Sequence, residues 1–537
     1  MAVALLGALS VTDIINYTIP IQIIALFIGL LAVLVLLIDH ADILLRSWHV
    51  RGLHRVTSET FFKTRFRKRL SGTELEDALQ NAYNKYTKQG KPFATKADLE
   101  SWIILLPPKA MKEWCNLPFK HLNFTSYLQD VTAMGYHTQV NCQTHLRAVI
   151  AYNQKKHFEK IQRDMACDTK EFLPSLLGNP NHKEWTEFNL FGTSSPLLML
   201  FSTSLVLGPE FSRDQELMTQ ITSHVLGIEE VLEEFNKYPR ILRPLVWGFS
   251  PLCRAFRSNV STLRPKIIPE MRRRIELLRS GELAADDLTM LTIFLKQALK
   301  DGLLSKEESA DDEKQIESLF MKSLFHIYEV WGPINPLLIS LLSRVMASPE
   351  YVDELREEVS KALASSANGW ESDFLAKTPK LESFTRETLR LNVAIAVSVS
   401  RVLHAPLKLK SVDMDLPKGS YIGLPIKFMH TDPEIYPDPM TFDRYRFYDQ
   451  ASNTCTARAT TGSENFLPFG YGGGICPGRF IGVKAAQVAF SKFLLEYDLQ
   501  FASKDQKLPP MNLAENTWTW PEMDVMAKVR RRQPESS

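Results

Sequence analysis

The hydrophobic pattern of the chain opens with one long run that carries no charge. Residues 14–38 contain no Asp, Glu, Lys or Arg, and from Ile19 onward Gln22 is the one strongly polar side chain. A helix needs about 20 apolar residues to cross a bilayer. A cleaved signal peptide has a shorter apolar core and a basic start, and a buried core helix is a second alternative. The run therefore predicts a transmembrane helix.

The charges on either side of this run are unequal. Asp13 is the one charged residue before it, whereas Lys and Arg are frequent between residues 46 and 69, where Glu59 is the one acid. Basic flanks stay on the cytoplasmic side of a membrane. We expect residues 1–45 to form a single N-terminal anchor and residues 46–537 to form a cytosolic body.

The body alternates long helical periods with short strand-like runs. An amphipathic pattern from Ser71 ends at Gly90, a residue type that caps helix C-termini. Two apolar runs, 92–95 and 102–106, have the length of paired strands, and the pattern from 109 to about 310 is mostly helical. The body is therefore predicted to be mainly α with small β-sheets.

A long apolar helix is predicted at residues 315–348, ended by Ser348-Pro349, a cap followed by proline. Pro333 and Pro336 lie inside it and are expected to break or kink it. Five further elements are predicted after it: helices at 351–364, 381–391 and 480–495, a strand at 400–402 and a hairpin at 412–422.

Composition and charge exclude several classes of protein. The chain has 537 residues, a net charge of +2 and six scattered cysteines, none in a Cys-x-x-Cys pair. So small a net charge does not argue for nucleic acid as a partner. Few, unpaired cysteines in a long chain argue against a disulfide scaffold and suit a reducing compartment.

The candidate chemistry lies in one glycine-rich stretch, Phe466–Phe480, which contains Cys476. Its glycines allow positive φ and let a flat group approach the main chain. Pro477 fixes φ just after the cysteine, and an apolar helical period follows. The free amides and dipole at a helix N-terminus favour a thiolate over a thiol.

This stretch resembles the heme-binding loop of the cytochrome P450 family, whose pattern is Phe-x-x-Gly-x-x-x-Cys-x-Gly. Phe469, Gly472, Cys476 and Gly478 fill its four places. The resemblance implies a heme b cofactor whose iron is held by the Cys476 thiolate. A glycine-rich turn with a buried cysteine is the alternative interpretation.

A second signature is a Glu-x-x-Arg pair, formed by Glu387 and Arg390, which are three residues apart on one helix face. In the family this pair locks with an arginine of a later segment, which matches Arg446, with Arg444 as the alternative. The resemblance implies that this triad is structural and holds the heme-side core together.

The resemblance also implies partners for the heme propionates. Arg401, in the strand after the Glu-x-x-Arg helix, matches an arginine that reaches a propionate; a surface arginine is the alternative. Two residues before the cysteine the family usually has Arg or His, and this chain has Gly474. That departure leaves more of the neutralisation to Arg401.

The long helix at 315–348 resembles the helix that crosses the distal face of the heme. Counting back from Pro349 places Gly332 and Pro333 where most members carry an acid and a threonine that relay protons. Neither residue donates a proton through its side chain. Freed carbonyls and Asn335 can hold a water in their place; alternatively, the prolines only shape the pocket and protons arrive by water or a substrate hydroxyl.

The resemblance covers roughly residues 50–530 and implies the triangular helical P450 fold after one transmembrane helix. The implied reaction inserts one oxygen atom from O2 into a small apolar substrate, with electrons from NADPH through NADPH–cytochrome P450 reductase and with cytochrome b5 as a further partner. The implied location is the endoplasmic reticulum membrane, and similar fungal members oxidise terpenoids, polyketides or alkaloids. The alternatives are a heme-thiolate isomerase or ring-rearranging enzyme, which needs no proton relay, and a tethered scaffold with a decayed heme site.

Overall fold

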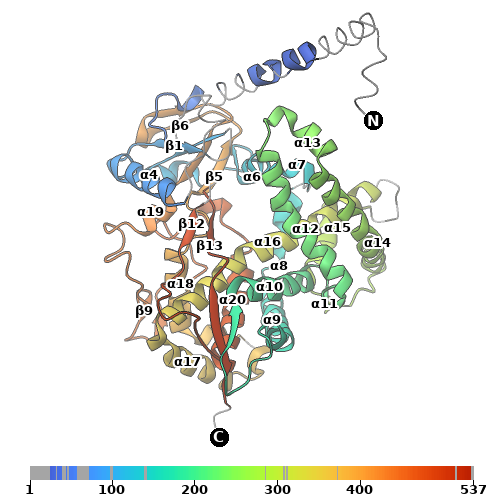
Figure 1. The fold of residues 1–537 in the computed structure, drawn as a ribbon. Helices are drawn as coiled ribbons and strands as arrows, with labels where there is room; N and C mark the ends of the chain where they lie inside the picture. Colours follow the sequence, from blue (N-terminus) through green and yellow to red (C-terminus); the bar gives the residue numbers. More distant parts are fainter. Residues whose placement is uncertain are drawn as a thin grey trace, which may run out of the picture.

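A computed structural model gives the fold of the chain (Figure 1). The structure describes residues 25–31, 33–38, 41, 44, 48–56, 72–96, 101–137, 142–284, 286–305, 307, 309, 312–371, 373–513 and 517–533. Residues 1–24, which make up much of the expected anchor, therefore lie outside the described residues.

The described part of the body is mainly helical, as predicted. Its α-helices are α4 (Gly72–Lys85), α5 (Met111–Trp114), α6 (Phe124–Thr132), α7 (Met134–His137), α8 (Cys142–Tyr152), α9 (Lys155–Leu176), α10 (Leu190–Val206), α11 (Pro209–Arg213), α12 (Gln215–Asn236), α13 (Arg243–Phe249), α14 (Pro251–Ser280), α15 (Met290–Lys300), α16 (Asp312–Ala347), α17 (Val352–Ala364), α18 (Pro379–Leu391), α19 (Ile426–His430) and α20 (Arg479–Glu496). The helices predicted at 315–348, 351–364, 381–391 and 480–495 are confirmed as α16, α17, α18 and α20.

The largest sheet has the strand order β1-β2-β8-β5-β3. Its strands are β1 (Phe93–Lys96), β2 (Trp102–Leu105), β8 (Tyr421–Leu424), β5 (Ser398–Leu403) and β3 (Leu122–Asn123). The two predicted early strands pair antiparallel with each other, and the predicted strand at 400–402 lies in β5. This sheet forms the upper left part of the molecule in Figure 1.

Smaller sheets join distant parts of the chain. A three-stranded sheet places β14 (Met526–Arg531) between β11 (Tyr497–Phe501) and β4 (Thr186–Asn189). The two-stranded sheets pair β6 (Leu407–Leu409) with β7 (Met414–Leu416), β9 (Tyr448–Asp449) with β10 (Thr454–Cys455), and β12 (Met511–Leu513) with β13 (Thr519–Pro521).

The predicted hairpin at 412–422 is wrong. β7 pairs antiparallel with β6, whereas β8 pairs with β2 and β5 of the large sheet. The turn between them does form, since the amide of Ser420 donates to the carbonyl of Pro417. The strands separate because β8 is buried along its whole length inside a larger sheet, which offers it two partners instead of one.

Helix α16 crosses the middle of the molecule, where α10 and α20 pack against it (Figure 1). Of the break or kink expected at Pro333 and Pro336, the break does not occur, since the helix runs without interruption through both residues. A proline inside a helix costs about 3 kcal/mol through its lost hydrogen bond and its ring clash. Burial of the surrounding apolar residues outweighs that local cost, because tertiary packing supplies most of the stability of a helix.

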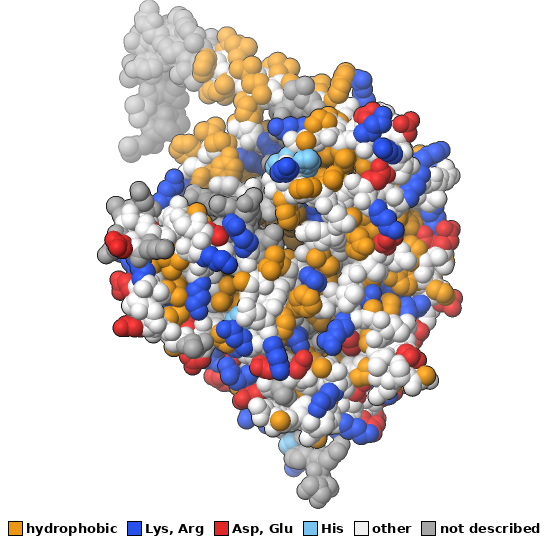
Figure 2. Space-filling model, turned by 180° about the vertical axis from the view of Figure 1, so that it is seen from behind, with side chains coloured by type: hydrophobic (Ala, Val, Ile, Leu, Met, Phe, Trp, Pro, Cys, Tyr) orange, Lys and Arg blue, Asp and Glu red, His pale blue; other side chains and the backbone are white. Residues whose placement is uncertain are grey.

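Among the described residues, α16 is the one helix long and apolar enough to cross a membrane, and most of its apolar window is buried in the protein. Residues 25–31 and 33–38 are also helical, and their large apolar side chains, such as Leu26 and Phe27, are exposed. Figure 2 shows these apolar atoms projecting from the top of the molecule, above a face on which basic and acidic side chains are mixed.

Candidate active site

The cysteine loop is a tight turn closed by a backbone hydrogen bond. The amide of Cys476 donates to the carbonyl of Phe469 over 2.8 Å. Gly472 has a φ of +66°, and a Cβ placed on it would lie 2.7 Å from the carbonyl oxygen of Cys115. Glycine meets both conditions without moving the chain, so its place in the loop has a steric cause.

Cys476 faces a space inside the protein. Protein surrounds the side chain closely enough for burial to raise the pKa of its thiol, yet the residue keeps an accessible surface. Both observations hold when a side chain borders an internal cavity. The amides of Gly478 and Arg479, at the start of α20, donate to the sulfur and lower the thiol pKa. The helix N-terminus thus favours the thiolate where burial opposes it.

Helix α16 provides another wall of this space. Pro333 is exposed, whereas the residues from Lys322 to Met346 are otherwise buried or half-buried. Its neighbour Ile334 packs on α20, since a Cβ on Gly482 would lie 3.4 Å from Ile334 Cγ1. The accessible surface of Pro333 therefore lies in the interior, close to the helix that begins beside Cys476.

Asn335 is turned away from this space. It is fully buried and accepts a hydrogen bond of 2.6 Å from the Ser194 hydroxyl of α10. Trp331, one turn earlier on the same face, donates its indole N–H to the carbonyl of Ser195 over 3.2 Å. Residues i and i+2 of an α-helix point about 200° apart around its axis. Pro333 and Asn335 therefore point in nearly opposite directions. The structure brings Pro333 to the cavity but not Asn335.

Arg401 lies against the cysteine loop with part of its guanidinium unpaired. Its Nη1 donates to the carbonyl of Ser400 over 2.7 Å, while the buried Nη2 has no hydrogen-bond partner among the described residues. Burial lowers the pKa of Arg401 to about 10. A buried cation without an anion is costly, so this site fits a cofactor that brings a carboxylate.

The space that a side chain at Gly474 would occupy is filled by Arg401. A Cβ placed on Gly474 would lie 1.8 Å from Nη2 of Arg401. The guanidinium therefore occupies the space that a larger residue of the loop would fill. The unpaired guanidinium of Arg401, from strand β5, and the interior sulfur of Cys476 meet at the same loop, and a heme needs both contacts, so the residues present fit this cofactor.

A bulge in strand β5 precedes Arg401. The register between β5 and β8 shifts between Ser398 and Arg401, and Val399 has a φ of +57°. Such a φ is strained for a β-branched residue. An extra residue in one strand reverses the faces to which later side chains point, so the bulge determines which face Arg401 presents.

The Glu-x-x-Arg pair and the later arginine come together in the core. Glu387 and Arg390 are fully buried and form two parallel hydrogen bonds of 2.7 and 2.8 Å. Nε of Arg446 donates to Glu387 Oε1 over 3.1 Å, and Arg390 Nη1 donates to the carbonyl of His430. The alternative, Arg444, pairs instead with Glu354 over 2.8 Å. The geometry therefore assigns Arg446, and not Arg444, to the triad.

His430 connects the triad to the cysteine loop, a role that sequence reasoning missed. Its Nε2 accepts from the amide of Leu467 over 2.9 Å, and its Nδ1 lies 3.1 Å from the carbonyl of Arg390. Burial lowers the pKa of His430 to about 3, so the ring is neutral with its proton on Nδ1. The sequence carries no signal for this role, since no second histidine or cysteine stands at metal-ligand spacing from His430.

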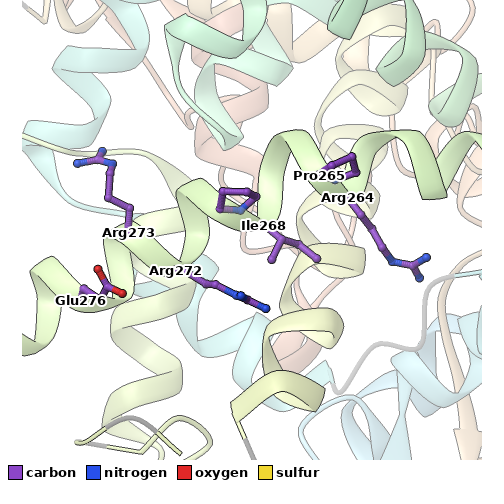
Figure 3. Close-up of a pocket in the computed structure, with 7 residues that line it drawn as sticks. Arg264, Pro265, Ile268, Arg272, Arg273 and Glu276 are labelled. Atoms are coloured by element: carbon purple, nitrogen blue, oxygen red, sulfur yellow. The ribbon is translucent and has the colours of Figure 1, made fainter. Parts of the chain in front are cut away.

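A surface hollow on α14 is not part of this site. It has a volume of about 570 Å³ and is lined by residues of that one helix, among them Arg264, Arg272 and Arg273 (Figure 3). Each of these arginines already pairs with an acid: Arg264 with Glu317, Arg272 with Glu313, and Arg273 with Glu270. The hollow is open to solvent, and none of its lining residues belongs to the cysteine loop.

Comparison with solved structures supports the fold. The chain matches a retinoic acid bound cyanobacterial cytochrome P450, CYP120A1, with a TM-score of 0.62 over 85% of this chain and 94% of the other, at 15% identity. At that identity the match shows the fold alone.

Comparison with known sequences identifies the family. Residues 145–526 match the Cytochrome P450 family profile. The chain is 34% identical to the cytochrome P450 monooxygenase cnsC of Penicillium expansum, covering 80% of this chain and 88% of that protein. It is 31% identical to the bicoumarin synthase desC of Aspergillus desertorum (86% and 87% covered) and 34% identical to the bicoumarin synthase ktnC of Aspergillus niger (74% and 95% covered). The chain therefore belongs to the cytochrome P450 family, as a monooxygenase whose heme iron is held by a thiolate.

Proposed function

We propose that the protein oxidises an apolar secondary metabolite, such as a terpenoid, polyketide or alkaloid, at a heme held by Cys476. The observation that carries this proposal is the interior sulfur of Cys476, which accepts hydrogen bonds from two amides at the start of α20. In a monooxygenation, substrate, O2, NADPH and one proton give hydroxylated substrate, water and NADP+. A bound heme would supply the activation of O2. The residues of the chain bind and orient the substrate and exclude water from the site.

Several residues have distinct parts in holding the cofactor. Cys476 would hold the heme iron through its thiolate, and the glycines at 472 and 478 would leave room for the heme beside the loop. Phe469 is half-buried and packs on the core beside the loop. Arg401 pairs with a propionate through Nη2. The triad of Glu387, Arg390 and Arg446 keeps the supporting helix in place and does not take part in the chemistry.

The expected partners follow from the family. Electrons come from NADPH through NADPH–cytochrome P450 reductase, with cytochrome b5 as a further partner. Residues 1–45 anchor the protein in the endoplasmic reticulum membrane, with residues 46–537 in the cytosol. The uncharged run at 14–38 and the basic residues that follow support this arrangement.

The ligand assignment is tested by removing the thiolate. The reduced wild-type protein should give the red-shifted absorption band of a thiolate-bound heme with carbon monoxide, and Cys476→Ala should not. Cys455→Ala is the matched control, since Cys455 is half-buried in strand β10, away from the cysteine loop, and its thiol donates to the carbonyl of Ala457. Retention of the band in Cys476→Ala would overturn the assignment.

A second candidate is the oxidative joining of two aromatic molecules. The specific observation in its favour is that two relatives are named bicoumarin synthases, while Gly332 and Pro333 leave α16 without the usual proton-relay pair. Two phenols, O2, NADPH and one proton would give a coupled product, two waters and NADP+. Such a product contains no new oxygen atom.

Expression with a reductase in a metabolite-producing host separates these functions by mass. A gain of one oxygen atom supports monooxygenation, and a dimer that lacks two hydrogen atoms supports coupling. A product of unchanged mass that forms without NADPH would instead support the isomerase.

A further inference from the structure

Helix α16 carries an acid one turn before Pro333. Glu329 and Pro333 are four residues apart, so they lie on the same face of the helix. Glu329 keeps 32% of its side-chain surface free, whereas Phe325, Val330 and Trp331 around it are buried. As with Pro333, this free surface belongs to the middle of a core helix. Glu329 therefore borders the same interior space.

The carboxylate also acts on the sulfur at the other side of this space. Glu329 is the strongest charge that raises the pKa of Cys476, ahead of the opposing charge of Arg479, although burial is the larger cause. Coulomb interactions weaken with distance. The effect agrees with the placement of Glu329 on the Cys476 side of α16. That placement itself follows from the four-residue spacing to Pro333 and from the exposed part of the Glu329 side chain.

His326 holds the carboxylate in position. Its Nδ1 lies 3.0 Å from Glu329 Oε2, and its ring is buried, with only 6% of the side chain exposed. The ring also packs edge-on against Phe294 of α15, with centroids 5.2 Å apart. A buried imidazole fixed in this way orients its carboxyl partner and can exchange a proton with it.

We propose that Glu329, positioned by His326, supplies protons to oxygen bound in this cavity, in place of the acid and threonine that positions 332 and 333 lack. The proposal rests on the heme-thiolate function above and adds its proton donor. The Glu329 carboxyl gives up a proton and takes one back from Nδ1 of His326. Each monooxygenation passes two protons along this route and releases one water; oxidation of NADPH returns one proton to the solvent, so the net consumption is one proton.

The test uses hydrogen peroxide and a chromogenic phenol, so it requires neither the natural substrate nor the reductase. One peroxide oxidises two phenols by one electron each and is reduced to two waters, a reaction that needs the same proton transfer. Glu329→Gln should lower its rate about 100-fold, within the usual contribution of a general acid–base group. Added formate should restore part of the rate in Glu329→Ala. Glu317→Gln, on the surface of the same helix and paired with Arg264, should match the wild type.

A second readout does not depend on turnover. In the carbon monoxide complex, the infrared difference spectrum should show a carboxyl C=O band that shifts in deuterium oxide and disappears in Glu329→Gln. His326→Gln should shift this band and lower the peroxide rate less than Glu329→Gln does. Heme content and the red-shifted carbon monoxide band should stay as in the wild type.

The outcomes distinguish a failure of the heme-thiolate function from a failure of the proton-donor role of Glu329. If the wild type lacks the red-shifted band, the heme-thiolate function itself fails. If the wild type has it but Glu329→Gln keeps both the wild-type peroxide rate and the infrared band, the heme function stands and the role of Glu329 is overturned.

Discussion

At the scale of single residues, the contact between Gly474 and Arg401 determines how the loop meets a propionate. Gly474→Ala would place a methyl group 1.8 Å from Nη2 and 2.6 Å from Cζ of Arg401. The guanidinium is buried and cannot retreat into water without moving strand β5. We expect Gly474→Ala to displace Arg401 and to lower the heme content of the purified protein severalfold, measured as heme absorbance per protein.

The adjacent glycine provides a matched control. A Cβ on Gly473 would meet no atom within 4 Å, so Gly473→Ala adds the same methyl group to the same loop without a clash. It should retain the wild-type heme content. Equal heme loss in both variants would mean that the loop requires glycine for its backbone alone, and that the contact with Arg401 is not the cause.

What the sequence shows at this scale is the identity of the residues and not their directions. The spacing of Phe469, Gly472, Cys476 and Gly478 was enough to predict the cysteine loop. The direction of Arg401 depends on the bulge at Val399, which leaves no pattern in the sequence. Asn335 was predicted to serve the cavity because its residue type can hold a water, yet the helical phase turns it toward α10. Glu329 could have been found from its four-residue spacing to Pro333.

At the scale of elements, the Glu387 carboxylate joins α18 to the segment that contains Arg446. Glu387→Gln keeps the size of the side chain but removes the charge that pairs with two arginines. Removing one partner of a buried ion pair usually costs about 3–5 kcal/mol. We expect the free energy of unfolding of the heme-loaded protein, measured in urea, to fall by an amount in this range, with a lower midpoint.

An exposed pair of the same chemistry is the comparison for this prediction. Arg264 and Glu317 join α14 to α16 at 2.6 Å, but both side chains are more than a third exposed. Pairs of this kind contribute about 0–1 kcal/mol. If Glu317→Gln and Glu387→Gln shift the midpoint equally, burial of the triad is not what makes it important.

The packing of α20 on α16 gives a prediction about side-chain size. A Cβ on Gly482 would lie at an ordinary van der Waals distance, 3.4 Å, from Ile334 Cγ1. Gly482→Ala should therefore fold like the wild type. Gly482→Leu has no space and should lower the free energy of unfolding by about 1–3 kcal/mol, the usual cost of overpacking. Thermal unfolding of both variants checks this, and equal midpoints would show that the two helices separate easily.

Elements were predicted well where one local rule decided them and poorly where packing did. Proline caps, glycine ends and helical periods placed α16, α17, α18 and α20 to within a few residues. The same rules predicted a break or a kink at Pro333 and Pro336, but burial keeps α16 continuous, so no break occurs. They also joined residues 412–422 into one hairpin, whereas competition between two sheets separates β7 from β8.

At the scale of the whole molecule, one buried carboxylate makes stability depend on pH. Asp168 of α9 is almost fully buried and accepts a hydrogen bond of 2.8 Å from Arg213, at the end of α11. Burial raises the pKa of Asp168 to about 6, from 3.8, and the Arg213 guanidinium offsets only part of that rise. The folded protein thus keeps this proton at a pH where the unfolded chain has lost it.

The sign of the effect follows from this order of pKa values. Below pH 3.8 both states hold the proton and the side chain gives its full contribution to stability; this contribution is lost as the pH rises to about 6. The loss is about 3 kcal/mol, since each pKa unit corresponds to about 1.4 kcal/mol. Asp168→Asn cannot ionise, so its thermal midpoint relative to the wild type should rise between pH 4 and pH 7. Glu171→Gln, which also contacts Arg213 but is exposed, should follow the wild type. A constant difference between Asp168→Asn and the wild type over this range would show that Asp168 is already ionised in the folded protein, with Arg213 compensating fully for its burial.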